Sequence, residues 1–395
     1  MTKITSIKTT PVNVPLEAAY VWTYGLFPGF TQSIIEITTD DGITGIGEAP
    51  SASAAAAISN GFADRLIGRD PIDIQGCELA CLPSYPGVQS VADFGSLASF
   101  GGIELALWDI RGKLWQRPVY ELLGGAVRKS IPFTDYFVYR EKNGEAGGEQ
   151  TPEEVAEYCL RMKEEFGSTA FEGKMSEFDP KASIRLIEVL RKALGDDALI
   201  RVDSNSAYSV IVARMMAPAL EELGVDNWED PVGSYDELLR LRPHTRLSIS
   251  GHNTDIGKAA AYKVPDAIVS GISGNGGFIR TLKLVAACEA AGIDFWCYSG
   301  DTGIQSAAYL HLCAASPWIR RPNQSLFHTQ PLDVIEEGPF QLRNNLLEVP
   351  EGPGLGVTLS QDKLQHMHKL FVDNGPLNKY IDPANPGRMR RPPLA

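Results

Sequence analysis

The stretch of sequence that decides the fold runs from Phe171 to Asn253. Four strings within it lie at the ends of short apolar runs: FEGKM (171–175), RVDSN (201–205), NWEDP (227–231) and SISGHN (248–253). Helical stretches such as 181–195 and 279–292 separate runs of this kind, so the pattern predicts repeated βα units with parallel strands. This many units favour a closed barrel over an open sheet. In a βα barrel the chemistry lies at the carboxyl ends of the strands, where all four strings fall.

The flanking sequence continues this alternation of strand and helix. Residues 131–139 (IPFTDYFVY) predict a strand, and residues 151–167 predict a helix that Thr151 and Glu154 begin in a capping-box arrangement. From about residue 345 the chain becomes rich in Pro and Gly, and a helix near residues 363–371 precedes an irregular tail. We expect this tail to return to the first domain.

The first part of the chain predicts a separate α+β unit. Residues 4–14 alternate as a strand, and residues 33–48 read as two strands joined by an Asp-Gly turn. Helical spacing then follows through about residue 123. Between the strands, residues 17–30 are rich in Gly and aromatic side chains and show no period. This composition is typical either of a surface loop or of a lid that closes over a pocket.

Composition and charge narrow the class of protein. A chain of 395 residues is too long for one core, which indicates two domains or a barrel with a large addition. The formal charge of -13 argues against a nucleic-acid partner, because such partners demand clustered Lys and Arg. No apolar run approaches the roughly 18 residues of a membrane span, and no signal-peptide layout is present, so we expect a cytoplasmic chain. The six scattered cysteines predict reduced thiols.

Asp203 and Glu229 close consecutive predicted strands and would converge in a barrel. Two facing carboxylates repel one another unless a cation lies between them, and hard oxygen ligands on rigid strands suit Mg²⁺. The alternative is that each carboxylate caps the helix that follows it. The next strand offers His252 or Asn253 as the third ligand, and we rank His252 first.

Lys174 ends the strand before Asp203 and is the candidate base. An amine beside a bound dication and away from bulk water has a lowered pKa, so it can take a proton from carbon at neutral pH. The alternative is a surface lysine that pairs with Glu172.

Three regions of the chain resemble the enolase superfamily, in particular the branch of mandelate racemase, muconate lactonizing enzyme and the acid-sugar dehydratases. They are the stretch GIELALWDIRGKLWQRPVYELLGG (102–125), the series Lys174, Asp203 and Glu229 with spacings of 29 and 26 residues, and the string PEGPGLGV (350–357).

This resemblance implies both an architecture and a chemistry. The architecture is a modified (β/α)7β barrel at residues 129–345, with an α+β capping domain formed by residues 1–128 and by the returning segment 346–395. The chemistry is Mg²⁺-dependent abstraction of a proton alpha to a carboxylate, which gives an enediolate. Asn205 matches the second half of the family's Asp-x-Asn and is expected to orient a ligand or a water molecule.

The sequence also departs from that family. Glu172 stands where the family's Lys-x-Lys motif has its first lysine, which usually helps to hold the substrate carboxylate. The sixth strand ends in IVSG without the second lysine of the muconate branch, and Tyr298 stands where the racemase and glucarate-type branches carry a catalytic histidine. A two-base racemase is therefore disfavoured. Lys174 remains as the base, with Tyr298, Asp301 or His328 as the candidate acid.

Together these residues predict an Mg²⁺-dependent dehydratase, a carbon–oxygen lyase, that converts a sugar acid or related hydroxy-carboxylate to a 2-keto-3-deoxy product. The alternatives are a racemase, epimerase or cycloisomerase on the same enediolate, or a relative with an impaired site. The residues expected to line the substrate pocket are Glu172, Asn205, Trp22, Tyr24 and Tyr136, although core packing explains the aromatic ones equally well. We expect a small-molecule carboxylate substrate, a homo-oligomer, and no nucleic-acid or membrane partner.

Overall fold

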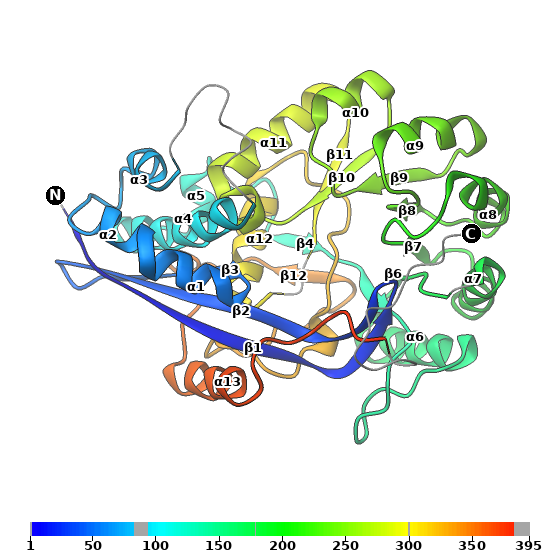
Figure 1. Cartoon of the computed structure of the whole chain (residues 1–395), viewed down its shortest axis with the longest axis horizontal. Coiled ribbons are helices and arrows are strands. Elements are labelled where there is room, and N and C mark those ends of the chain that lie inside the picture. Colours follow the sequence, from blue (N-terminus) through cyan, green and yellow to red (C-terminus); the bar gives the residue numbers. More distant parts are fainter. Residues whose placement is uncertain (1, 83–93, 178, 299–300, 383–395) are drawn as a thin grey trace.

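A curled sheet of seven parallel strands forms the centre of the structure (Figure 1). The computed structural model describes residues 2–82, 94–177, 179–298 and 301–382. The strand order is β11-β10-β9-β8-β7-β6-β5. The strands are β5 (Asp135–Phe137), β6 (Ala170–Lys174), β7 (Leu199–Asp203), β8 (Asn227–Glu229), β9 (Ser248–Gly251), β10 (Ala267–Ser270) and β11 (Asp294–Cys297).

Helices follow the strands along the chain and cover the outside of the sheet. They are α6 (Pro152–Phe166), α7 (Pro180–Leu194), α8 (Val210–Glu222), α9 (Tyr235–Leu241), α10 (Ile256–Tyr262), α11 (Phe278–Ala291) and α12 (Gly303–Ala315). Single 3-10 turns lie at Arg242–His244, Ser273–Asn275 and Phe327–Thr329. The expected capping box begins α6, where Thr151 and Glu154 each accept from the other's backbone N–H. The helix predicted at 151–167 is therefore confirmed.

The two edges of the sheet are joined by a short extended segment around Asn323. Gln324 N donates to Cys297 O at the end of β11, and Thr134 N donates to Asn323 O just before β5. The ring is thus closed, and every strand directs its carboxyl end to the same rim. The barrel class expected from the sequence is confirmed.

The segment predicted as one strand at 131–139 is divided between two sheets, so that prediction is wrong in part. Its first half, β4 (Ser130–Pro132), pairs with β12 (Leu346–Glu348), and only its second half, β5, belongs to the barrel. The chain therefore passes from one sheet to the other at Phe133 and Thr134, where the segment around Asn323 attaches.

The N-terminal cap is an antiparallel sheet of β1 (Ile4–Trp22), β2 (Gly25–Thr39) and β3 (Thr44–Pro50), followed by helices. The helices are α1 (Ala52–Ala57), a π-helical turn (Ile58–Phe62), α2 (Ala63–Leu66), α3 (Ile74–Cys81), α4 (Phe94–Trp115) and α5 (Val119–Leu122). The turn between β2 and β3 confirms the expected hairpin. Residues 17–30, however, are not a loop: they extend β1 and β2 into a long ribbon.

The β1–β2 ribbon runs from the cap across to the barrel, as the blue strands of Figure 1 show. Helix α13 (Gln361–Asn374), drawn in red, lies along β1, where Asn13 Nδ2 donates to Leu370 O at 3.3 Å and His368 Nδ1 lies 2.7 Å from Pro11 O. Among the described residues, no helix combines the length and apolar character needed to cross a bilayer.

Candidate active site

A cavity of about 650 Å³ lies between the carboxyl ends of the barrel strands and the tip of the β1–β2 ribbon. Small-molecule sites typically occupy roughly 300–1,000 Å³. Its lining includes Lys174, Asn205, Glu229, His252, Ser270, Tyr298 and Gln324 from the barrel, Tyr20, Trp22, Phe27 and Phe30 from the ribbon, and Lys379 from the C-terminal segment.

Lys174 and Asp203 form a buried ion pair at the ends of β6 and β7. The strands pair so that these residues lie side by side, and Lys174 Nζ donates to Asp203 Oδ2. Their side chains are 12% and 2% exposed, so water screens the pair little. Burial alone would lower the pKa of Lys174, but the charge of Asp203, aided by Tyr136 and Tyr20, raises this pKa well above its ordinary value.

This pairing corrects one expectation from the sequence. The alternative partner for Lys174, Glu172, does not contact it, and Lys174 does not lie at the surface. In the chain itself Asp203 stabilises the ammonium form, whereas the lowering of the Lys174 pKa expected beside a bound dication stays a prediction. Lys174 must leave Asp203 before its amine can accept a proton.

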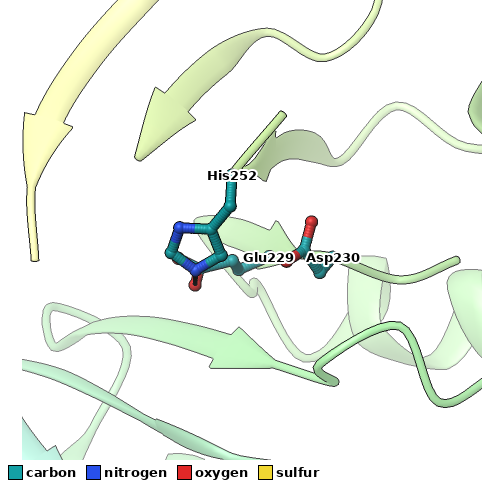
Figure 2. A group of neighbouring side chains, drawn as sticks. All are labelled: Glu229, Asp230 and His252. Carbon is teal, nitrogen blue, oxygen red and sulfur yellow. Dashed lines mark ion pairs between the residues drawn. The ribbon is translucent and has the colours of Figure 1, made fainter. Parts of the chain in front are cut away.

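Glu229, Asp230 and His252 form a second charged group at the ends of β8 and β9, shown in Figure 2. His252 Nε2 lies 3.0 Å from Glu229 Oε1, and its Nδ1 lies 3.0 Å from Val269 O. One ligand atom from each of the three residues lies within 4.8 Å of the others. Burial disfavours a charged His252 ring, yet the Glu229 carboxylate outweighs burial and raises the His252 pKa. Water weakens this effect, since 42% of the His252 side chain is exposed.

Asn205 lies between the Lys174–Asp203 pair and the cavity, which it lines. Its backbone N–H and its side-chain Nδ2 donate to the two oxygens of Asp203, at 2.7 and 2.8 Å. Its Oδ1 is buried and has no hydrogen-bond partner among the described residues. Asn205 and Asp230 also adopt the left-handed backbone region, with φ of 47° and 41°. Such strained non-glycine residues cluster at functional sites.

This arrangement fits a divalent cation. Burial, together with the charges of Glu229 and Asp203, raises the pKa of Asp230 to about 7 even though His252 opposes the shift. Acidic oxygens under such repulsion, beside an unused amide oxygen, are the hard ligands that Mg²⁺ prefers. His252 belongs to this set. Asn253 lines the cavity as well, but its Oδ1 accepts from Asp255 N at 3.1 Å, at the start of α10.

Glu172 lies beneath the cavity and does not line it. Its side chain is 1% exposed, and its Oε2 lies 3.8 Å from Arg201 NH1. Gln324 Nε2 donates both to Glu172 Oε1 and to Glu229 Oε2, each at 2.5 Å. Burial and the charge of Glu229 raise the pKa of Glu172 to about 8. Glu172 is thus not among the residues that line the cavity, and it positions Gln324, which is.

The ribbon residues expected in the pocket differ in placement. Trp22 and Tyr136 line the cavity. Tyr24 does not: its hydroxyl donates to Asn205 O at 2.7 Å, while Thr23 Oγ1 donates to Ser204 O at 3.1 Å. The ribbon tip is thus fixed to the loop after β7 and forms one wall of the cavity.

Only one of the three candidate acids faces the cavity. Tyr298 lines it, with its ring 5.5 Å from that of His252, and burial raises its pKa. The oxygens of Asp301 instead accept from Gln32 and Tyr309, at 2.7 and 2.8 Å. His328 lies in a different hollow, 3.0 Å from Asp135 Oδ2 and stacked on Phe166. The structure therefore brings Tyr298, but neither Asp301 nor His328, to the site.

Sequence reasoning missed three residues of this site. Asp230 follows Glu229 directly in the string NWEDP, so its acidic side chain at a strand end was a usable signal. Gln324 and Lys379 lie in irregular sequence and are placed by partners far along the chain, Gln324 by Glu172 and Glu229 and Lys379 by Trp22. No local pattern could have identified them.

Two family models match the chain. The mandelate racemase / muconate lactonizing enzyme N-terminal domain matches residues 5–124, and the enolase C-terminal domain-like model matches residues 154–363.

Individual relatives are distant but cover nearly the whole chain. A probable glucarate dehydratase from Streptomyces coelicolor is 26% identical over 94% of this chain and 92% of its own length. A chloromuconate cycloisomerase from Pseudomonas putida is 29% identical over 92% and 98%. An enolase from Gibberella zeae PH-1, crystallised with magnesium, formate and sulfate, superposes with a TM-score of 0.83 at 25% identity over 95% and 92%.

Proposed function

Since this chain belongs to the mandelate racemase and muconate lactonizing enzyme branch of the enolase superfamily, we propose that it is a magnesium-dependent dehydratase of an acid sugar. Its relatives include both a dehydratase and a cycloisomerase, so the choice of reaction rests on the residues of this chain.

The observation that carries the proposal is the chemistry of the two sides of the cavity. Lys174 supplies an amine at the end of β6, where a proton acceptor is needed. From the ends of β10 and β11, the described lining residues include the hydroxyls of Ser270 and Tyr298 but no amine or imidazole. A racemase requires a second base there, whereas an elimination requires an acid. Because burial raises the pKa of Tyr298, its hydroxyl keeps its proton and suits the acid.

Glu229, Asp230 and His252, whose ligand atoms lie together, would hold Mg²⁺ with Asp203 from the neighbouring strand end. The unused Asn205 Oδ1 is a further oxygen at this site. Magnesium bound there supplies stabilisation of the negative charge that develops on the substrate carboxylate.

The residues of the chain then account for the proton movements. Lys174 Nζ, released from Asp203, accepts the proton from the carbon alpha to the carboxylate. The C–O bond at the neighbouring carbon breaks, and Tyr298 donates its proton to the departing hydroxide, which leaves as water. The remaining enol becomes a 2-keto-3-deoxy acid, and Tyr298 regains a proton from the Lys174 ammonium through solvent. The ribbon excludes bulk water while Lys174 takes the alpha proton and the hydroxide leaves.

The test is a panel of mono- and di-acid sugars incubated with enzyme and Mg²⁺, with 2-keto acid formation as the readout. We expect product from at least one acid sugar, and none after Mg²⁺ is chelated. Exchange of the alpha hydrogen with deuterated water, without 2-keto acid, would favour a racemase or cycloisomerase instead. Absence of Mg²⁺ binding in calorimetry would contradict every enzymatic reading of the site.

A further inference from the structure

We propose that Lys379 binds an anionic group at the far end of the substrate, so that the substrate of this enzyme carries two anionic groups. The inference rests on the proposed function, since it assigns one anionic end to the metal side of the cavity and the other to the C-terminal segment.

The C-terminal segment (residues 375–382) forms an extra edge on the β1–β2 ribbon. Leu26 N donates to Ile381 O at 2.8 Å, and Leu377 N donates to Thr31 Oγ1 at 2.9 Å. Between these contacts, the indole of Trp22 donates to Lys379 O at 2.7 Å. These bonds fix the backbone of Lys379 against a ribbon residue that itself lines the cavity.

The ammonium of Lys379 has no anionic partner within the described parts of the chain. It lies over the rings of Phe27 and Phe30, 5.1 and 5.6 Å from their centroids. The closest electrostatic influence is Asp301, whose two oxygens already accept from Gln32 and Tyr309. Burial lowers the pKa of Lys379, against the opposing charge of Asp301, so the ammonium loses water without gaining an ion pair.

The other cations of the cavity are already committed. Among the described lining residues, Lys174 pairs with Asp203, and His252 pairs with Glu229. An anionic group that enters on the ribbon side therefore meets one uncommitted positive charge. A partly desolvated ammonium forms a strong, charge-assisted hydrogen bond with such a group.

Lys379 is held by a different part of the fold from the residues proposed to react with the substrate. Lys174, Asp203 and Glu229 come from adjacent barrel strands, whereas Lys379 is held by the ribbon. A carboxylate at Lys379 thus marks the unreacting end of the molecule. Either a second carboxylate, as in an aldaric acid, or a terminal phosphate supplies the required charge.

The first experiment compares kcat/KM on three substrates with the same carbon chain: an aldaric acid, its aldonic counterpart and the terminally phosphorylated aldonate. Lys379→Gln should lower kcat/KM about 10- to 100-fold on the substrate with a distal charge and less than about threefold on the uncharged aldonate. Which of the two charged substrates shows the selective loss identifies the distal group as carboxylate or phosphate. Equal loss on all three substrates, or no loss, would overturn the proposal.

Lys369→Gln is the matched control, because it removes the same charge from an exposed site on α13, where the lysine pairs with Asp373. This variant should leave kcat/KM unchanged on every substrate. If it reproduced the selective loss, general charge rather than Lys379 would be responsible.

A second measurement does not need turnover. Calorimetry in the presence of Mg²⁺ compares the binding of two unreactive ligands, adipate with two carboxylates and hexanoate with one. Lys379→Gln should weaken adipate binding about tenfold or more and leave hexanoate unchanged. Selective weakening without turnover of any acid sugar would refute the proposed reaction and keep the role of Lys379. If the enzyme turned over an acid sugar but Lys379→Gln weakened both ligands equally, only the role of Lys379 would be refuted.

Discussion

Replacement of Lys174 by methionine separates its two roles, as partner of Asp203 and as base. Methionine keeps most of the apolar stem but removes the charge. The pair is buried, with side chains 12% and 2% exposed, so loss of the cation leaves an uncompensated carboxylate. Removing one partner of a buried pair costs roughly 3–5 kcal/mol. We therefore expect the free energy of unfolding of Lys174→Met to fall by about this amount without Mg²⁺.

Magnesium should recover most of that loss, because the cation replaces the missing charge at Asp203. Chemical denaturation with and without Mg²⁺ measures the difference. The pH dependence has a defined sign: burial raises the pKa of Asp203 above its ordinary value, so the carboxylate is protonated more readily in the folded chain than in the unfolded chain. The deficit should be largest above that pKa and shrink as the pH falls. Lys369→Met, which removes an exposed pair with Asp373, should change stability by less than about 0.5 kcal/mol.

Exchange of the substrate's alpha hydrogen in deuterated water, with Mg²⁺ present, measures the catalytic role of Lys174. General-base residues contribute roughly 10²–10⁴-fold, so exchange in Lys174→Met should fall by at least that range. Exchange at the wild-type rate would remove Lys174 from its assigned role. A stability loss that Mg²⁺ does not reduce would show that Asp203 is not a metal ligand.

Three further perturbations test other parts of the structure. His252→Gln should weaken Mg²⁺ binding at least about tenfold in calorimetry, whereas Asn253→Ala should not; the reverse result would exchange their assignments. His311 is buried, and burial lowers its pKa to about 4, so the unfolded chain is protonated first as the pH falls. The free energy of unfolding of the wild type, measured from denaturation curves relative to His311→Gln, should therefore fall by about 3 kcal/mol between about pH 6.5 and 4. If the difference between the two proteins did not change with pH, the ring would not be neutral in the fold. A Cβ on Gly25 would lie 2.5 Å from Ile381 O at a φ of 141°, so Gly25→Ala should detach the C-terminal segment. Hydrogen exchange of residues 377–382 should rise, and wild-type protection would refute that docking.

The sequence predicted those features that local patterns determine. The capping box at Thr151 is complete within four residues, and the acids at 203 and 229 lie at the ends of runs whose length and composition favour strands. The repeated rhythm of these units led directly to the barrel.

Features that depend on distant partners were not predictable in this way. Residues 17–30 lack a strand period in the sequence because apolar side chains such as Val21, Leu26 and Phe30 also occupy the half-buried positions that alternate with the buried ones. The ion pair of Lys174 was not foreseen either, because its partner Asp203 comes from the next strand. Similarly, Asp301 is turned away by Gln32, a residue from the cap 269 positions earlier in the chain.

The ribbon edge that the C-terminal segment covers stays open while the ribosome is still making the chain. β3 pairs with β2 only from Gln32 to Thr38, so the ribbon edge from Gly25 to Thr31 is completed by residues made much later. Trp22 and Lys379 are 357 residues apart, and ribosomes add roughly 5–20 residues per second. A nascent chain therefore exposes this open, aromatic-rich strand for roughly 20–70 s. Unpaired edges recruit other strands, so the interval before the ribbon is covered is the period in which aggregation of the growing polypeptide is favoured.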